Sequence, residues 1–174
     1  IKEAKRGSES VKGGSFMDRR RFLVLSSFLT LVLTLVFSNA VAANSYGSDV
    51  SKQLSEVRQV TAKYHDIQAA FDDGYVTDYH IVPNMGIHVV KPELIGDGIL
   101  DPLAPEVLVY DPKKNGDYKL VAVEYLTFGD DPPYLFGQQF DVGPFPNSFA
   151  LHAWIWQGNP DGKFNATNRN VANN

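Results

Sequence analysis

The spacing of apolar residues divides the chain into a helical part and a strand-rich part. From Asp49 onward, apolar and small side chains recur at intervals of three, four and seven residues, at Val50, Leu54, Val57, Thr61, Tyr64 and Phe71. This spacing predicts one amphipathic helix of about six turns that ends near Gly74. Such a helix buries its apolar stripe against a neighbouring layer, and we expect that layer to be a sheet.

After Tyr75 the apolar residues no longer recur at helical spacing but at every second position, as in a strand. Residues 75–82 alternate loosely, residues 86–90 read as a short strand, and residues 148–156 read as the last strong strand. Residues 129–147 contain four prolines and three glycines, and an irregular loop of this length is more typical of ligand binding than of packing. The predicted fold is α+β: one long N-terminal helix packed on an antiparallel, barrel-like sheet of about four to five strands.

The segment 105–128 has the pattern of a β-hairpin. Residues 114–116 fit a three-residue loop in which Gly116 adopts the left-handed conformation. A regular ladder from this loop places Glu106 directly opposite Glu124, on one face. Two neighbouring carboxylates are unfavourable unless they share a proton, meet a cation or hold a metal ion. A two-residue loop would instead put the two glutamates on opposite faces, so the interpretation depends on register.

Four strands of the second half each carry one ionisable residue among apolar neighbours. These residues are His88, Glu106, Glu124 and His152. If their faces converge, they form a ligand set for a divalent transition metal such as Zn, Mn, Fe or Ni, because imidazole and carboxylate suit these ions.

The alternative is that the two glutamates lie on a solvent-exposed face. The other face of the hairpin, with Val107, Val109, Val121 and Val123, is the more uniformly apolar one. A sheet covered on both faces would satisfy both patterns.

Five further residues are candidates for the site. Tyr110, Trp154 and Trp156 are expected to wall a ligand-binding pocket with aromatic surface. His80 is a candidate metal ligand or general base. His65 is expected on the surface of the helix, close to a carboxylate, and is the weaker candidate.

Residues 17–42 have the pattern of an export signal peptide. Three arginines at 19–21 precede an apolar run over 22–37, and Ala40-Val41-Ala42 matches a cleavage site. The run is shorter than the roughly 20 residues of a spanning helix, so we expect cleavage and no stable membrane insertion. The leader also partly matches the twin-arginine export motif. We expect a periplasmic or extracellular protein.

This leader defines the expected domain organisation. Residues 1–16 are interpreted as upstream or cloning-derived sequence, residues 43–48 as a linker, and residues 49–174 as a single α+β domain.

Composition excludes several classes of function. Without the leader, nine Lys and Arg stand against 17 Asp and Glu, and this surface repels nucleic acid and anionic lipid. The chain contains no cysteine, so any metal site must use histidine, carboxylate or backbone oxygen. It also lacks a Gly-x-Ser-x-Gly nucleophile motif and a phosphate-binding glycine loop, which argues against acyl-enzyme chemistry and nucleotide binding.

Four local patterns together resemble a family of exported bacterial proteins of uncharacterised activity. The patterns are MGIHVV at 85–90, DPLAPEVLVY at 101–110, VEY at 123–125, and LHAWIWQGNPDGKF at 151–164. The resemblance covers roughly residues 63–171, and it implies export and the domain limits rather than an activity. Family members often carry a cysteine near the end of the helix and another at the end of the chain; this chain has neither.

Two hypotheses of function follow from the sequence. The first is an exported divalent-metal-binding domain, which if catalytic would be a small metalloenzyme with a glutamate as general base. The second is a non-catalytic secreted protein that binds an apolar small ligand or a partner through the Trp-rich strand and the loop 129–147. The oligomeric state, the substrate and the metal are not specified by these patterns.

Overall fold

The computed structural model describes residues 47–171, and these form an α+β fold. The predicted leader and the residues before it lie outside the described residues. The strands are β1 (Ile81–Val82), β2 (Gly86–Val90), β3 (Val107–Pro112), β4 (Tyr118–Phe128), β5 (Tyr134–Leu135), β6 (Gln138–Gln139), β7 (Asp141–Val142) and β8 (Ser148–Ala153). Within residues 47–171, no helix combines the length and the apolar character needed to cross a membrane.

The N-terminal helix is shorter than the sequence predicts. It covers residues 47–65, and its last turn, η1 (Ala62–His65), is a 3₁₀ helix. Asp66 has an extended backbone, and its side chain accepts a hydrogen bond from the Gln68 backbone N–H at 3.0 Å. This cap begins a second helix, α2 (Ile67–Asp72), so the single six-turn helix is broken by a residue that prefers caps to helix interiors.

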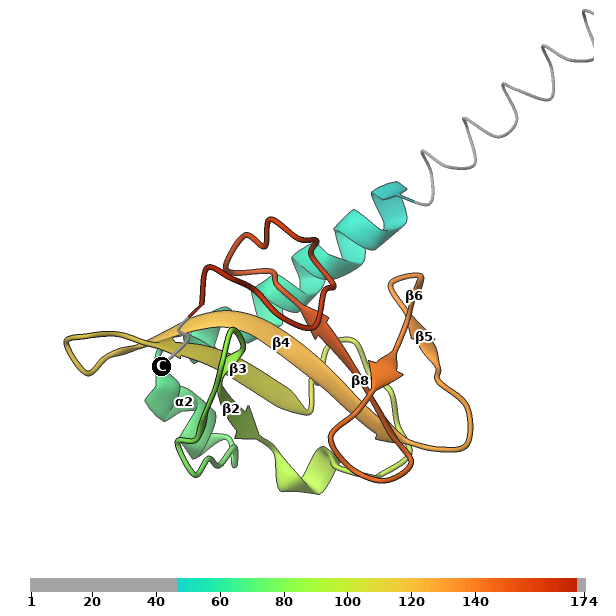
Figure 1. The fold of residues 1–174 in the computed structure, drawn as a ribbon, viewed down its shortest axis with the longest axis horizontal. Coiled ribbons are helices and arrows are strands. Elements are labelled where there is room, and N and C mark those ends of the chain that lie inside the picture. Colours follow the sequence, from blue (N-terminus) through green and yellow to red (C-terminus); the bar gives the residue numbers. More distant parts are fainter. Residues whose placement is uncertain (1–46, 172–174) are drawn as a thin grey trace, which may run out of the picture. The chain divides into compact units, whose positions relative to one another are not determined.

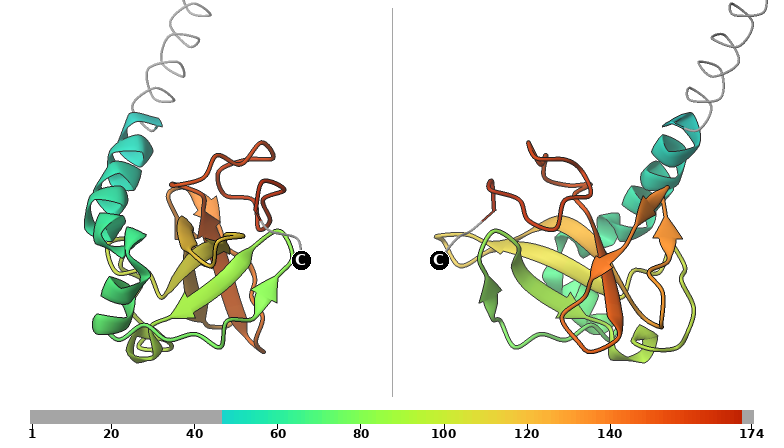
Figure 2. Two further views of the ribbon diagram at one scale, coloured as in Figure 1. Left: turned by 90° about the vertical axis from the view of Figure 1, so that its left-hand side faces the viewer. Right: turned by 45° about the vertical axis from the view of Figure 1, so that its right-hand side comes forward.

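The main sheet has six antiparallel strands in the order β1-β2-β3-β4-β8-β7, and it curves into a half-barrel. The helix crosses one face of this sheet, as Figures 1 and 2 show. The short strands β5 and β6 form a separate ribbon within the loop 129–147. The 3₁₀ turn η2 (Pro92–Leu94) lies in the connection between β2 and β3.

The hairpin turn matches the prediction, but the register beyond it does not. Gly116 has φ +88°, and the Lys113 N–H donates to the Asp117 carbonyl at 2.8 Å, as expected for a three-residue loop. Tyr110 pairs with Leu120, and a β-bulge then shifts the ladder by one residue. Beyond the bulge, Glu124 pairs with Val107, so the predicted pairing of Glu124 with Glu106 is wrong.

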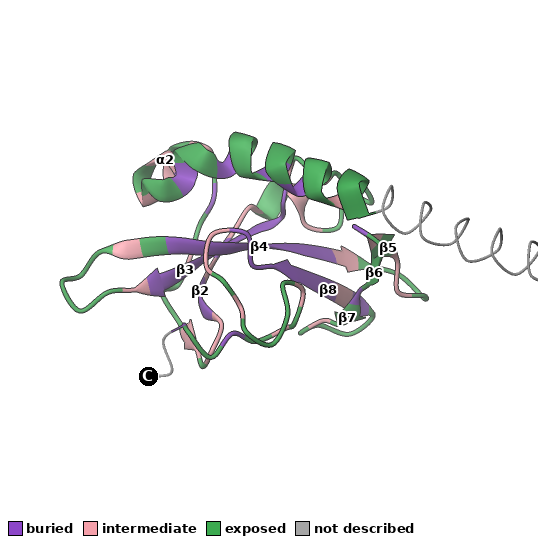
Figure 3. Cartoon of the chain, turned by 90° about the horizontal axis from the view of Figure 1, so that it is seen from above, coloured by how far each residue is buried: buried purple, intermediate pink, exposed green. Residues whose placement is uncertain are grey.

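Both faces of the sheet are covered, which resolves the conflict in the sequence pattern. The helix packs on a core that includes Leu108, Val123 and Leu151. The opposite face carries smaller apolar clusters around Val109, Trp154 and Val171, and around Val107, Leu126 and Ala150. Figure 3 shows the central strands buried along most of their length, while the outer side of the helix is exposed.

The C-terminal segment contributes to this second cover. Asn168 and Val171 are buried, and the Asn168 N–H donates to the Asn84 carbonyl at 2.7 Å.

A substitution at Gly86 tests how closely the backbones of β2 and β3 approach each other. Gly86 has φ +98°, and a Cβ added there would lie 2.3 Å from the Tyr110 carbonyl oxygen. We expect Gly86→Ala to lower the free energy of unfolding by more than about 3 kcal/mol, because left-handed strain and a backbone clash add together. Urea denaturation measures this change.

Gly116→Ala is the matched control, because Gly116 also has a positive φ but a Cβ there meets nothing within 4 Å. Its cost should be about 1 kcal/mol from backbone strain alone. Equal losses in the two variants would contradict the close approach of β2 to β3.

Candidate metal centre

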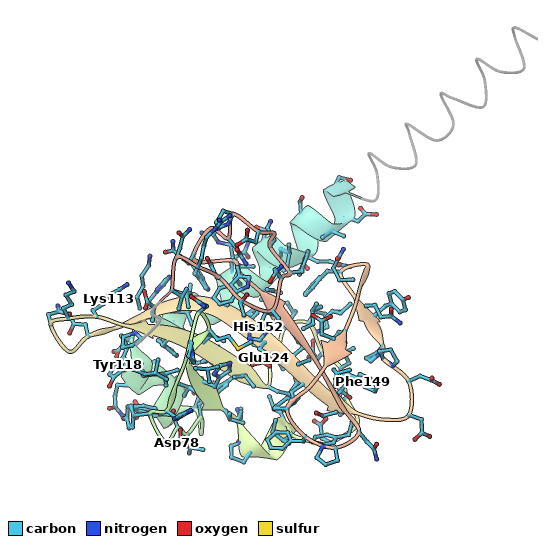
Figure 4. The ribbon with its side chains drawn as sticks, in the orientation of Figure 1. Asp78, Lys113, Tyr118, Glu124, Phe149 and His152 are labelled. Carbon is cyan, nitrogen blue, oxygen red and sulfur yellow. The ribbon has the colours of Figure 1, made fainter. Side chains whose placement is uncertain are left out.

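Three of the four predicted ligands come together on the sheet face that points away from the helix. His88 lies on β2, Glu124 on β4 and His152 on β8. Glu124 pairs directly with His152, while β3 separates β2 from β4. Side chains on one face of a curved sheet approach each other, and Figure 4 shows Glu124 and His152 close together at the centre of the fold.

The Glu124 carboxylate lies between the two imidazoles. Its Oε2 is 3.3 Å from His88 Nε2 and 3.6 Å from His152 Nε2. The side chains of Glu124 and His152 are 7% and 6% exposed, and that of His88 is 22% exposed. The triad is therefore buried, with His88 as the member closest to solvent.

These separations fit the ligand atoms of a metal site. The three nearest ligand atoms lie within 4.8 Å of one another. Bonds of about 2.0–2.1 Å to a tetrahedral ion place two ligand atoms roughly 3.3 Å apart, close to both measured N···O separations. Two imidazoles and one carboxylate are also the ligand types that catalytic zinc sites and non-haem iron sites use. The triad could hold a metal ion.

Burial disfavours charge on every member of the triad. It raises the pKa of Glu124 to about 8, with a smaller contribution from the carboxylate of Glu106. It lowers the pKa of His152 to about 3 and that of His88 to about 4. Near neutral pH the metal-free triad is then a neutral carboxyl group and two neutral imidazoles. A divalent cation would reverse this preference for Glu124, because it stabilises the carboxylate.

His152 Nε2 is a buried nitrogen that finds no hydrogen-bond partner among the residues that the structure describes. Its 3.6 Å separation from Glu124 Oε2 is too long for a hydrogen bond. The ring is held from one side by Trp154, whose ring is parallel within 13° at a centroid distance of 5.6 Å. A buried nitrogen left without a partner costs free energy, and an ion bound by the triad would remove that cost.

The triad forms the floor of a cavity of about 530 Å³. Its walls include Val90 and Leu126 from the sheet, together with Val142 and Phe145 from the loop 129–147. The prediction that part of this loop serves a site is consistent with its place in the wall. The exposed residues Asp78, His80 and Asp141 also line the cavity and define its rim.

Glu106 does not join the triad, and this corrects the predicted four-residue site. The bulge in β4 leaves Glu106 on the side of β3 that carries Leu108 and Tyr110, which face the helix. Glu106 Oε2 instead accepts a hydrogen bond from the Leu126 N–H at 3.2 Å. Burial raises the pKa of Glu106 to about 7. Its role in the structure is to satisfy a backbone donor of β4.

The predicted aromatic residues do not line the cavity above the triad. Tyr110 is buried in the helix-facing core, where its hydroxyl donates to the Tyr64 carbonyl at 2.6 Å. Trp156 lies beneath the guanidinium of Arg58, with 4.6 Å between Arg58 Cζ and the ring centroid. Trp154 contacts the triad only through the ring of His152.

The two additional histidines lie in different places. His65 packs edge-on against Trp156 at a centroid distance of 4.3 Å, on the helix side of the sheet. His80 lines the cavity near His88, and its charge helps to lower the pKa of His88. The rim carboxylate of Asp78 was missed at the level of sequence. The sequence pattern that could have identified Asp78 is its spacing of two residues from His80, which puts both side chains near the mouth of the same cavity.

Comparisons of the chain with protein-family models, with curated proteins and with solved structures find no match. The resemblance to a family of exported bacterial proteins stays a prediction.

The buried carboxyl of Glu106 predicts a pH-dependent stability in metal-free protein. Its pKa is about 7 in the folded chain and near 4.5 when unfolded, so its favourable contribution is complete below pH 4.5 and disappears as the pH rises past 7. We expect the stability of Glu106→Gln relative to wild type to increase by roughly 2 kcal/mol between pH 5 and pH 8. Urea denaturation of both proteins across this range measures the difference.

Glu93→Gln is the control, because the Glu93 side chain is 69% exposed and its carboxylate stays in water. A difference for Glu106→Gln that does not change with pH would show that Glu106 is not desolvated.

Proposed function

We propose that this domain binds one divalent transition-metal ion through His88, Glu124 and His152. The observation that carries the proposal is the buried His152 Nε2, which has no hydrogen-bond partner within residues 47–171 and lies beside a buried carboxylate and a second imidazole. Each of these groups alone would be costly to bury, and one ion compensates all three. Zn, Mn, Fe and Ni all accept this set of ligands.

Three protein ligands leave coordination positions open to a ligand from the cavity. A bound ion there would act as a Lewis acid toward an oxygen or nitrogen atom of that ligand. The sequence suggested one of the two glutamates as a general base; Glu124 belongs to the triad, and Glu106 does not line the cavity. We therefore propose metal binding coupled to capture of a small molecule as the function that the geometry supports best.

We also propose that the domain is exported. The support is the leader pattern of residues 17–42. Expression of the full chain in a bacterium, followed by mass measurement of the periplasmic protein, tests this. A mass that corresponds to a chain beginning at Ala43 is expected, and retention of the leader in the cytoplasm would refute the proposal.

Metal stoichiometry provides the first test of the ligand set. Wild-type protein dialysed against Zn²⁺ should retain about one equivalent. Glu124→Gln should weaken zinc binding by at least about tenfold, because it removes the anionic ligand while preserving the shape of the side chain. Elemental analysis and competition with a chromophoric chelator measure the equivalents and the Kd.

Glu106→Gln is the matched control, because Glu106 is a second buried glutamate that lies outside the triad. It should retain one equivalent with an unchanged Kd. An equal loss in both variants would contradict the three-residue site and would favour the four-residue site predicted from the sequence.

Metal-dependent stability provides the second test. At free Zn²⁺ of 100 times the Kd, binding should add about 2.7 kcal/mol to the free energy of unfolding. Chelator should reverse this gain in wild type, while His152→Ala should show no gain at any Zn²⁺ concentration that saturates wild type. The comparison is made within each variant, with and without metal, so a lower basal stability of His152→Ala does not affect it.

The exposed His65→Ala controls for the loss of one imidazole and should keep the full gain. A normal metal-induced gain in His152→Ala would exclude His152 as a ligand.

A further inference from the structure

We infer that the cavity above the triad selects a small, uncharged, largely apolar molecule that carries one nitrogen or oxygen donor for the metal. This inference rests on the proposed metal binding, and it names the class of ligand that the open coordination positions receive.

The size and the walls of the cavity argue for an apolar ligand. Its volume of about 530 Å³ lies within the range of pockets that enclose small organic molecules. The lining is mainly hydrocarbon: Val82, Met85, Val90 and Leu126 are buried or half-buried, and the exposed Val142 and Phe145 lie at the rim. An apolar group that enters this space leaves water, and this lowers the free energy of binding.

The polar groups of the cavity are arranged at two depths. The triad lies at the floor, where Glu124 and His152 are buried. The other ionisable side chains of the lining, Asp78, His80 and Asp141, are exposed at the rim. An elongated ligand with its donor atom at one end can therefore reach the metal and leave its hydrocarbon part against the walls.

The charges of the lining argue against a charged ligand. No lysine or arginine lines the cavity among the residues that the structure describes, while Asp78 and Asp141 place two carboxylates at the rim. An anion is repelled by these carboxylates at the entrance of the cavity. A cation is repelled by the metal at the floor, where a divalent ion beside ionised Glu124 leaves a net positive charge. An uncharged donor meets neither repulsion.

The experiment uses Co²⁺-loaded full-length protein at pH 7.5 and three probes. The probes are imidazole, 4-phenylimidazole and phenylacetate, which separate the donor group, the apolar group and the charge. We expect 4-phenylimidazole to perturb the visible absorption of Co²⁺ and to bind at least tenfold more tightly than imidazole. We expect phenylacetate to bind at least tenfold more weakly than 4-phenylimidazole.

Two variants connect these preferences to the cavity. Ala150→Leu fills space in the wall and should reduce the advantage of 4-phenylimidazole over imidazole. Asp78→Asn combined with Asp141→Asn removes the rim carboxylates and should narrow the affinity gap between 4-phenylimidazole and phenylacetate at least threefold.

The outcomes separate this inference from the proposed function. One equivalent of bound Co²⁺ with no advantage for 4-phenylimidazole would overturn the inference and leave the metal site intact. Binding of 4-phenylimidazole with equal affinity to chelator-treated protein would also overturn it, because the ligand would then not be anchored by the metal. Failure of wild-type protein to bind Co²⁺ would refute the metal site and, with it, this inference.

Discussion

The burial of one carboxyl group, that of Glu124, is the constraint on which the rest of the structure depends. Glu124 sits near the middle of β4, on a sheet face that is covered rather than wet. A carboxylate at such a position is costly unless a cation, a hydrogen-bond donor or a proton compensates it. The fold provides two imidazoles at 3.3 and 3.6 Å, from strands on either side, and leaves room above them for an additional group.

The two faces of the sheet have separate roles. On the helix side, three tyrosine hydroxyls donate to backbone carbonyls at 2.6 to 2.8 Å; the pairs are Tyr75 with Pro105, Tyr110 with Tyr64, and Tyr125 with Pro102. These bonds tie the sheet to the helix and to the connection between β2 and β3. The opposite face carries the triad.

This division places the triad on strands and part of the cavity lining in the connection between β7 and β8. Strands hold side chains in more closely defined positions than loops do. The triad lies on strands of the main sheet, while the lining above it includes Phe145, which lies in the connection between β7 and β8.

Much of the architecture is predictable from the spacing of apolar residues along the chain alone. The change from helical spacing to alternation locates the helix and β2, and the positions of Lys114, Asn115 and Gly116 predict the turn of the central hairpin. The break at Asp66 was not predicted, because apolar spacing continues across it into α2 and only the local cap reveals it. The shortest strands, β1, β5, β6 and β7, contain two residues each, which is too few for alternation to be recognised.

All three members of the candidate site were predicted from the sequence, whereas the fourth predicted ligand, Glu106, lies apart from them. His88 and His152 each stand in a short strand of regular alternation, so the face that each occupies follows directly from the sequence. Glu124 and Glu106 are related through the hairpin, and a single irregularity between Val109 and Tyr110 separates them. A bulge depends on the packing of both strands against the rest of the fold, and no residue type in β4 indicates it at the level of sequence. Trp154 lies on the triad face and stacks on His152 without lining the cavity, whereas Tyr110 and Trp156 lie on the helix side of the sheet.

The bulge has a consequence for how this protein can change over evolution. Residues 123–128 of β4 are paired with β8 and residues 122–124 with β3, whereas residues 118–120 are paired with β3 alone. The orientation of Glu124 is thus fixed by its neighbours in the sheet and not by counting residues from the turn. Insertions and deletions near the tip of the hairpin can be absorbed at the irregularity, so the tip is free to diverge in length while the half of the strand that carries Glu124 keeps its orientation.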